Sequence, residues 1–401
     1  MSDSINDTPR SGRLHIGLFG RRNAGKSSLI NAITGHDTAI VSDTAGTTTD
    51  PVYKSMEIHG LGPCVLIDTA GFDDEGSVGE LRIEKTRQAL DKTDIALLLL
   101  SGDDLSVEKE WLAAIRKRKT PYILILNKMD ERSPEELERL RQRIQEEMKH
   151  EPVCVSAALG TNMDKLREAL LRKVPADWGK LAITGKLCKE GDVVMLVMPQ
   201  DIQAPQGRLI LPQVQVTREL LDKKCIVISC TADKIQQSLD ALARPPHLII
   251  TDSQVFPQVW KLKPEQSLLT SFSILMAGFK GDIDSFIEGA AAIDRLTPDS
   301  RVLIAEACTH APLEEDIGRV KIPARLRARY GDSLKIDMVS GTDFPEDLTG
   351  YDLIIHCGAC MFNRTYMLSR IRKAKEQGVA ICNYGVALAK LAGILDKIEH
   401  V

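Results

Sequence analysis

The stretch GRRNAGKS, Gly20 to Ser27, decides the fold class of this sequence. It fits the pattern G-x-x-x-x-G-K-S/T, it follows the apolar run LHIGLF at 14–19, and a stretch with helical character comes after it. In such a loop the glycines let backbone N–H groups converge on phosphate oxygens, a lysine neutralises the β and γ phosphates, and a hydroxyl binds Mg²⁺. We therefore expect a phosphate loop between a strand and a helix. The expected phosphate and Mg²⁺ contacts are Gly20, Asn23, Ala24, Gly25, Lys26, Ser27 and Ser28.

Three later segments follow expected strands in the order that is typical of small GTPases. DTAG, Asp68 to Gly71, places a carboxylate near Mg²⁺ and a backbone N–H near the γ-phosphate. NKMD, which ends at Asp130, resembles the guanine-reading motif, in which the aspartate accepts hydrogen bonds from the N1–H and the exocyclic amine of the base. SAA at 156–158 resembles the loop that closes over the base. The sequence therefore predicts GTP rather than ATP, and the expected base contacts are Asn127, Lys128, Asp130, Ser156 and Ala157.

The details around these motifs resemble the TrmE–Era branch of the GTPases. AIVSDTAGTTTDP at 39–51 is similar to its first switch, with Thr48 as the threonine that would join Mg²⁺, and Asn23 stands where potassium-activated members bind K⁺. Phe72 replaces the glutamine that positions water in Ras-like enzymes. By the same resemblance Glu80 is a candidate for activating water, although a solvated carboxylate at a helix start explains it as well. The expected catalytic set, with slow hydrolysis that K⁺ stimulates, is Lys26, Thr48, Gly71 and Glu80.

The composition limits the class of protein. The 401 residues are 43% hydrophobic and 27% charged, which fits two or three globular domains. A net charge of -4 argues against a nucleic-acid-binding protein, because such proteins usually carry a basic excess. The polar first residues and the short longest apolar run, DIALLLLSG at 94–102, predict a cytoplasmic protein without a membrane span. Nine cysteines in that compartment are reduced thiols, so clustered ones are candidates for metal or redox chemistry.

Alternating apolar runs and amphipathic stretches predict an α/β fold of three domains. Residues 1–176 are expected to form an N-terminal Ras-like P-loop GTPase domain, in which SPEE at 133–136 predicts a helix start with a capping box. Residues 177–263 carry no chemical motif, and we expect a middle α/β dimerisation domain there. Residues 264–401 return to strand–helix alternation and predict a doubly wound α/β domain, in which ligands lie beyond the carboxyl ends of the strands.

The last domain holds two groups of soft ligands. CTH places Cys308 and His310 at the end of one expected strand, and HCGAC places His356, Cys357 and Cys360 at the end of another. Cys-x-x-Cys brings two thiolates close enough to share a metal ion or to form a disulfide, and Cys308 can complete a set of three. A helix expected to start just after the second group would lower the thiol pKa values and favour an anionic site.

Four interpretations of these groups stay open from the residues alone. A thioredoxin-like redox pair leaves Cys308 and both histidines unexplained. A structural zinc site of the Cys₃His type fits the ligands, and so does a [4Fe–4S] cluster with three thiolates and an exchangeable fourth ligand. Buried cysteines at strand ends explain each residue singly, but not five soft ligands in two tight groups. A metal site is favoured, and the residues do not separate zinc from iron.

A TrmE–Era-like GTPase domain, a middle domain without motifs, and the pair CTH and HCGAC together resemble, over the whole chain, the HydF family of [FeFe]-hydrogenase maturation GTPases. The segment TSFSILMAGFKGD at 270–282 is similar to that family's entry into its cluster domain. The resemblance implies a [4Fe–4S] cluster on three cysteines, with a fourth position that accepts a diiron precursor and that a histidine fills at rest. The implied ligands are Cys308, Cys357 and Cys360, with His356 preferred over His310 as the fourth.

The resemblance implies a scaffold more than a conventional enzyme. The protein would form a homodimer through its middle domain, receive the precursor from radical-SAM maturases and deliver it to apo-[FeFe]-hydrogenase, with no nucleic-acid or membrane partner. GTP hydrolysis would gate partner exchange. The alternative is a zinc-stabilised TrmE–Era-like GTPase in RNA or ribosome maturation. A third candidate, a GTP-dependent metal-insertion chaperone for another enzyme, shares every motif.

Overall fold

The structure, a computed structural model, describes most of the chain. The described residues are 9–36, 42–44, 51–71, 77–176, 178–199, 209–307, 316–359 and 361–401. Thr48, Cys308, His310 and Cys360 lie outside this part, as does Phe72. Glu80 lies in a described helix, but its side chain is outside what the structure describes. The chain divides into two compact units, Met1–Trp178 and Gly179–Val401, and each is described by itself.

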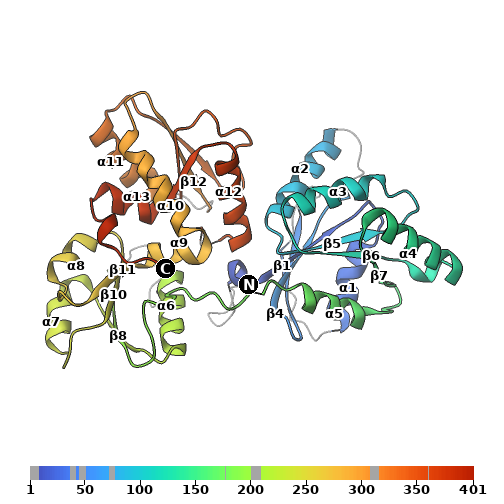
Figure 1. The fold of residues 1–401 in the computed structure, drawn as a ribbon, viewed down its shortest axis with the longest axis horizontal. Helices are drawn as coiled ribbons and strands as arrows, with labels where there is room; N and C mark the ends of the chain where they lie inside the picture. Colours follow the sequence, from blue (N-terminus) through green and yellow to red (C-terminus); the bar gives the residue numbers. More distant parts are fainter. Residues whose placement is uncertain are drawn as a thin grey trace. The chain divides into compact units, whose positions relative to one another are not determined.

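The first unit contains a seven-stranded sheet among its described residues (Figure 1). Its strands are β1 (Leu14–Phe19), β2 (Ser42–Thr44), β3 (Val52–Ile58), β4 (Gly62–Asp68), β5 (Ile95–Leu100), β6 (Tyr122–Leu126) and β7 (Val153–Cys154). Their order is β2-β3-β4-β1-β5-β6-β7, and only β3 pairs antiparallel, with β2 and β4. The central strands β1 and β5 are buried along their whole length, as expected for continuous apolar runs that are covered on both faces.

Helices cover both faces of this sheet (Figure 1). They are α1 (Lys26–His36), α2 (Ser77–Asp91), α3 (Ser106–Lys117), α4 (Pro134–Met148) and α5 (Met163–Lys173). α1 and α5 share one apolar core, to which Leu29 and Leu166 belong. α3 and α4 share another, to which Leu112 and Ile144 belong. The loops that follow β1, β4, β5 and β6 therefore emerge at one edge of a rigid three-layer structure, which is the edge that carries the sequence motifs.

The second unit contains two parallel four-stranded sheets among its described residues. The first has the order β11-β10-β8-β9 and the second the order β13-β12-β14-β15. Their strands are β8 (Val193–Val197), β9 (Ile226–Cys230), β10 (Leu248–Thr251), β11 (Leu268–Ser271), β12 (Arg301–Glu306), β13 (Lys335–Ser340), β14 (Leu353–His356) and β15 (Ala380–Asn383). In the second sheet the chain order reverses at β12, which pairs with both β13 and β14. The expected doubly wound α/β class is therefore confirmed.

The helices of the second unit alternate with these strands. They are α6 (Leu211–Asp222), α7 (Ile235–Asp240), α8 (Phe256–Leu262), α9 (Phe272–Lys280), α10 (Ile283–Ala290), α11 (Ile322–Tyr330), α12 (Arg364–Glu376) and α13 (Tyr384–Leu391). Shorter turns are the 3-10 segments Arg10–Gly12, Met129–Glu131, Ala232–Lys234, Ala291–Arg295 and Leu395–Lys397, and a π-helical turn at Ile317–Lys321. Asn363 caps α12, because its side chain accepts a hydrogen bond from the Tyr366 N–H at 3.3 Å.

The described elements that the sequence does not predict include β3, α6 and β13. β3 (VYKSMEI) and β13 (KIDMVS) mix charged and apolar residues, and β13 is a half-exposed edge strand, so neither shows the continuous apolar run of its neighbours. In α6 only Gln213, Val216 and Leu220 are buried. β11 belongs to the sheet of β8 to β10, although it follows residue 263, where we placed a boundary. The expected domain boundaries stay predictions.

One apolar core joins the two sheets of the second unit. It contains Val197 of β8 and Phe256 of α8 together with Leu303 of β12 and Ile355 of β14. The end of the chain returns to β11, where the Glu399 N–H donates to the carbonyl of Leu269 at 2.9 Å. Separate sheets thus form one compact unit. Among the described helices of the whole chain, none is long and apolar enough to cross a membrane.

Candidate nucleotide site and cysteine site

The phosphate loop connects β1 to α1 as predicted. Two of its residues have left-handed backbone conformations, Asn23 with φ 59° and Gly25 with φ 90°. A side chain at Gly25 would also be blocked in space, because its Cβ would lie 2.2 Å from Asn127 Nδ2. Gly71, at the end of DTAG, approaches the loop so closely that a Cβ there would lie 2.6 Å from the backbone nitrogen of Arg22. Both glycines are therefore required by close contacts as well as by the motif.

The polar side chains of the loop are already arranged for a phosphate and a metal ion. Lys26 is 8% exposed, and its ammonium donates to the carbonyls of Gly20 at 2.8 Å and Arg21 at 2.9 Å. Ser27 Oγ donates to Asp68 Oδ2 at 2.7 Å. A hydroxyl beside a carboxylate at the end of the neighbouring strand is the pair that holds Mg²⁺ in P-loop GTPases. The structure thus brings Ser27 and Asp68 together, as their motifs predict.

The base-reading motif is tied to the phosphate loop through Asn127. This residue is 2% exposed; its Nδ2 donates to the Ala24 carbonyl at 2.9 Å, and its Oδ1 accepts from the Ala157 N–H at 3.1 Å. Ser156 is buried, and its Oγ accepts from the Leu159 N–H at 3.1 Å, which shapes the loop after β7. One amide therefore connects the phosphate loop with the loop that is expected to cover the base.

The other expected contacts lie around this centre. Lys128 has φ 63°, which turns the chain so that Asp130 is exposed in the short turn that follows β6. Ser28 is exposed in the first turn of α1. Glu80 belongs to α2, which starts at Ser77. The water-activating role of Glu80, the K⁺ contact of Asn23 and the switch role of Thr48 stay predictions.

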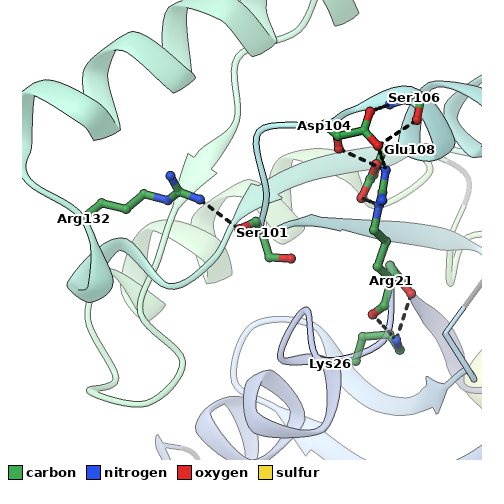
Figure 2. Close-up of polar contacts among 8 residues, drawn as sticks. Arg21, Lys26, Ser101, Asp104, Ser106, Glu108 and Arg132 are labelled. Atoms are coloured by element: carbon green, nitrogen blue, oxygen red, sulfur yellow. Dashed lines mark hydrogen bonds and ion pairs between the residues drawn. The ribbon is translucent and has the colours of Figure 1, made fainter. Parts of the chain in front are cut away.

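A network behind the phosphate loop that the sequence does not predict centres on Arg21 (Figure 2). The Arg21 guanidinium donates to Glu108 Oε1 at 2.9 Å, to Asp104 Oδ2 at 2.8 Å and to the Asp104 carbonyl at 3.1 Å. Burial raises the pKa of Glu108, a residue of α3 that is 1% exposed, while the Arg21 bond opposes that rise. The backbone N–H and hydroxyl of Ser106, followed by Arg21, lower the pKa of Asp104 to about 2. No pattern in the sequence around Arg21 indicates that Asp104 and Glu108 are its partners.

A second arginine supports the same loop after β5. Arg132, just beyond the base-reading motif, donates to the Ser101 carbonyl at 2.9 Å (Figure 2) and lies 3.5 Å from Asp103 Oδ1. Arg21 therefore contacts the β5–α3 loop from the phosphate side, and Arg132 contacts it from the base side. The loop at 101–105 is held between the two halves of the nucleotide site.

The cysteine site is described in part. Cys357 directly follows β14, and its sulfur accepts hydrogen bonds from the N–H of Ala307 at 2.9 Å and of Ala359 at 3.4 Å. Ala307 immediately follows β12, so the chain that leads into Cys308 contacts the sulfur of Cys357. Ala359 holds φ 53°, which turns its N–H back toward the sulfur. N–H donors stabilise negative charge on a thiolate, and hydrogen bonds to sulfur are a common feature of iron–sulfur sites. The described donor set therefore fits an anionic metal centre.

His356 is engaged by the protein itself. It is 0% exposed; Arg370 donates to its Nε2 at 2.7 Å, and its Nδ1 lies 2.9 Å from the Cys357 carbonyl. Because a guanidinium can only donate, Nε2 accepts and Nδ1 carries the ring proton. Burial, followed by the charge of Arg370, lowers the pKa of His356 to about 3. Both ring nitrogens thus have partners in this arrangement, and the ligand role expected of His356 stays a prediction.

Arg370 is itself unusual. It is 2% exposed, and three aromatic rings surround its guanidinium, those of Phe344, Phe362 and Tyr366, each with a centroid 4.7 Å away. Its hydrogen-bond acceptors are neutral, namely His356 Nε2, the Gly341 carbonyl at 2.7 Å and the Tyr366 hydroxyl at 3.1 Å. The guanidinium therefore fixes the ring of His356, the residue that directly precedes Cys357.

The rest of the expected ligand set is not assembled within the described part of the chain. Among the described residues, no group of three or more histidine, cysteine or acidic residues could hold a metal ion, and Cys308, His310 and Cys360 lie outside them. Cys382 of β15 is fully buried in the apolar core, and burial raises its pKa. The metal-ligand assignments stay predictions.

Comparisons with known proteins bear on the whole chain. A model of the hydrogen maturase F dimerization domain matches residues 183–281, and one of its tetramerization domain matches residues 284–400. This chain belongs to the hydrogen maturase F family. Residues 15–128 match the 50S ribosome-binding GTPase model, so the first unit contains a GTPase domain with sites for GTP and Mg²⁺. The family domains indicate oligomerisation. The sequence analysis predicts a dimer, and no motif in the chain predicts tetramerization.

Individual relatives match the N-terminal part of the chain. GTPase Der of Wolinella succinogenes is 37% identical over 178 residues, which are 42% of this chain and 37% of Der. The tRNA modification GTPase MnmE of Laribacter hongkongensis is 38% identical over 164 residues, 40% of this chain and 35% of MnmE. The chain thus spans little more than a third of these relatives. A structure of Era in complex with MgGDPNP and 16S ribosomal RNA nucleotides has 19% identity and a TM-score of 0.36, over 55% of this chain and 92% of Era.

Proposed function

We propose that this protein is a GTP-hydrolysing scaffold in hydrogenase maturation. In this proposal it holds a [4Fe–4S] cluster, carries a diiron precursor and delivers that precursor to apo-[FeFe]-hydrogenase. The observation that carries the proposal is the sulfur of Cys357, which accepts two backbone N–H bonds inside the segment that matches a hydrogen maturase F domain. A thiolate prepared in this way is a ligand for a soft metal centre.

The cluster would be held by Cys308, Cys357 and Cys360. When bound, it supplies an iron with an exchangeable fourth position, which is where cargo can attach. Arg370 and the Cys357 carbonyl engage both nitrogens of His356, which favours His310 or an external group at that position. The N–H groups of Ala307 and Ala359 would offset the negative charge of the sulfur ligand.

GTP hydrolysis would take place at the first site. Lys26 neutralises the phosphates, Ser27 and Asp68 hold Mg²⁺, Thr48 joins the metal in the GTP state, and the Gly71 N–H meets the γ-phosphate. Asn23 would hold K⁺ beside the phosphates, and Glu80 would orient water. We expect slow hydrolysis that is faster in K⁺ than in Na⁺ buffer, and equal rates in the two buffers would contradict the K⁺ role.

The partners in this proposal are a second copy of the chain, radical-SAM maturases that supply the precursor, and the apo-hydrogenase that receives it. The dimerization and tetramerization domains support the contact between copies. The acidic net charge of -4 supports protein partners over nucleic acid. A cytoplasmic location fits the reduced thiols that the cluster requires.

Anaerobic reconstitution with iron and sulfide tests the proposal. The full chain is expected to turn brown and to give an EPR signal on reduction, and the Cys357→Ala variant to lose both. Cys230→Ala, which removes a half-buried cysteine of β9, is the matched control and should keep both. A colourless protein that holds one stoichiometric zinc would instead support a zinc-stabilised GTPase in RNA or ribosome maturation.

A further inference from the structure

The ammonium of Lys26 is positioned by the backbone of Arg21. Lys26 Nζ donates to the Arg21 carbonyl at 2.9 Å as well as to the Gly20 carbonyl. The side chain of Arg21 in turn is fixed to α3 and to the loop before it (Figure 2). A continuous path of bonds thus runs from the buried carboxylate of Glu108, through Arg21, to the cation that meets the phosphates.

We propose that Arg21 and Glu108 form a positioning pair, which sets the place of Lys26 for GTP binding and hydrolysis. Neither member is a catalytic residue, because both act through the backbone of the loop. The guanidinium is paired with two carboxylates, those of Glu108 and Asp104, so its own charge is largely neutralised. The contribution of Arg21 is therefore geometric rather than electrostatic.

The loop needs such support because its own backbone is unfavourable. The left-handed conformation of Asn23, which carries a Cβ, costs free energy and persists only where the surroundings fix it, whereas Gly25 adopts its own without steric cost. Asn127 fixes the loop at Ala24, directly after Asn23, and Arg21 fixes it two residues before Asn23. The backbone is thus held on both sides of Asn23, which keeps the loop in one conformation when no phosphate is bound.

The pair is specific to arginine. A planar guanidinium presents separate N–H groups to Glu108 Oε1 and to the two oxygens of Asp104, whereas lysine offers a single flexible ammonium. Glu108 Oε2 is buried and accepts no hydrogen bond within the described part of the chain. Removal of Arg21 would thus leave a buried carboxylate unpaired, which destabilises the domain in addition to its effect on the loop.

Four variants of the full-length chain test the pair: Arg21→Ala, Arg21→Lys, Arg21→Ala/Glu108→Gln and Arg118→Ala. In the double variant, glutamine removes the unpaired charge and restores folding stability but not the position of the loop. Arg118 is the matched control, because its Nε donates to Asp91 Oδ1 at 2.7 Å at the other end of α3. The measurements are the dissociation constants of GTP and GDP, kcat and KM for GTP, and the melting temperature without nucleotide.

The expected result is a loss of about tenfold or more in GTP and GDP affinity and in kcat for both alanine variants at position 21. Arg21→Lys should give a smaller loss, the double variant should regain melting temperature without regaining affinity, and Arg118→Ala should stay within about twofold of the parent chain. Recovery of affinity together with melting temperature in the double variant would overturn the proposal, and so would affinity within about twofold of the parent in Arg21→Ala.

This inference rests on GTP use by the first unit, which is part of the proposed function, but the two can fail separately. A parent chain that binds GTP without hydrolysing it counts against the proposed function, while the affinities still test the pair. A parent chain that hydrolyses GTP, with variants that do the same equally well, counts against the pair alone.

Discussion

The nucleotide site and the cysteine site differ in how much of each the protein builds by itself. The nucleotide site is assembled from four loops at one sheet edge, and bonds within the chain already join Lys26, Ser27, Asp68 and Asn127 to their neighbours. In the cysteine site, Cys357 has its N–H donors in place, and the described residues do not complete a ligand set.

The two sites differ because they recognise their ligands through different groups. Phosphates are bound mainly by backbone N–H groups, whose directions are set by the loop itself. A metal cluster is bound by side-chain sulfurs from separate loops, and metal binding is commonly coupled to the ordering of its ligands. The nucleotide site can therefore be identified from hydrogen bonds within the chain. The cysteine site is identified from the N–H groups that donate to the sulfur of Cys357.

The variant with the largest predicted loss tests whether Asp130 of the nucleotide site binds the guanine base. Asp130→Asn replaces an acceptor for the base N1–H and amine with a carboxamide, so we expect GTP affinity to fall about 100-fold. Xanthosine triphosphate presents a carbonyl in place of that amine and should recover part of the loss. The measurement is equilibrium binding of both nucleotides, with the iron content of the reconstituted chain unchanged. Equal loss for both nucleotides would show that Asp130 does not read the base.

The next variant tests the hydrogen bonds of Asn127, which join the phosphate loop to the loop expected to cover the base. Asn127→Ala leaves the buried Ala24 carbonyl and Ala157 N–H without partners, which should cost about 1–3 kcal/mol of unfolding free energy. Urea unfolding of the parent and variant checks this, and GTP affinity should fall in parallel. Asn127→Asp can accept from Ala157 but cannot donate to Ala24, so an intermediate loss is expected. An unchanged unfolding midpoint would contradict the role of Asn127.

Much of the first unit could be predicted because its signals are local. The capping box of α4 is confirmed, with Ser133 Oγ 3.3 Å from the Glu136 N–H, since both partners lie within one turn. The pairing of Ser27 with Asp68 follows from motif order alone. The partners of Arg21 could not be predicted, because Glu108 lies far along the chain in a helix whose buried face looks like any other. β13 could not be predicted either, because a half-exposed edge strand lacks an apolar run.

At the cysteine site, the sequence predicts the types of ligand but not the partners of each side chain. Cys-x-x-Cys and the adjacent histidine predict ligands by type, but the partner of a histidine depends on side chains from other elements. His356 accepts a hydrogen bond from Arg370 of α12. Arg370 is buried, but nothing in the sequence distinguishes it from an arginine on the surface. The match to the hydrogen maturase F domains identifies the family of the second unit, but no sequence motif in residues 284–400 indicates tetramerization.

A smaller effect concerns the frame of the cysteine site. Arg370→Lys keeps the charge but cannot reach His356, Gly341 and Tyr366 together, so we expect about 1 kcal/mol less unfolding free energy. Arg372→Lys, at an exposed position of the same helix, is the control and should leave the midpoint unchanged. GTP affinity should not respond to either change. A loss of GTP affinity in Arg370→Lys would show that the surroundings of His356 influence the nucleotide site.

The smallest effect concerns the surface of the first unit. Arg141 donates to Glu138 at 2.9 Å on the exposed side of α4, where water and salt screen the pair. Arg141→Ala should leave the unfolding midpoint, the GTP affinity and the iron content as they are. Chemical unfolding with nucleotide titration checks this, and a clear shift in any of the three would show that this exposed face takes part in one of the sites.

The contact between Gly25 and Asn127 has a consequence for how sequences of this kind can change. A Cβ at position 25 would fall 2.2 Å from the amide nitrogen of Asn127, so the second glycine of the phosphate loop makes room for the base-reading motif. Two positions far apart in the chain thereby constrain each other. With φ at 90° and the Asn127 amide in place, position 25 accepts only glycine, and an alignment of relatives should show glycine at 25 wherever asparagine stands at 127.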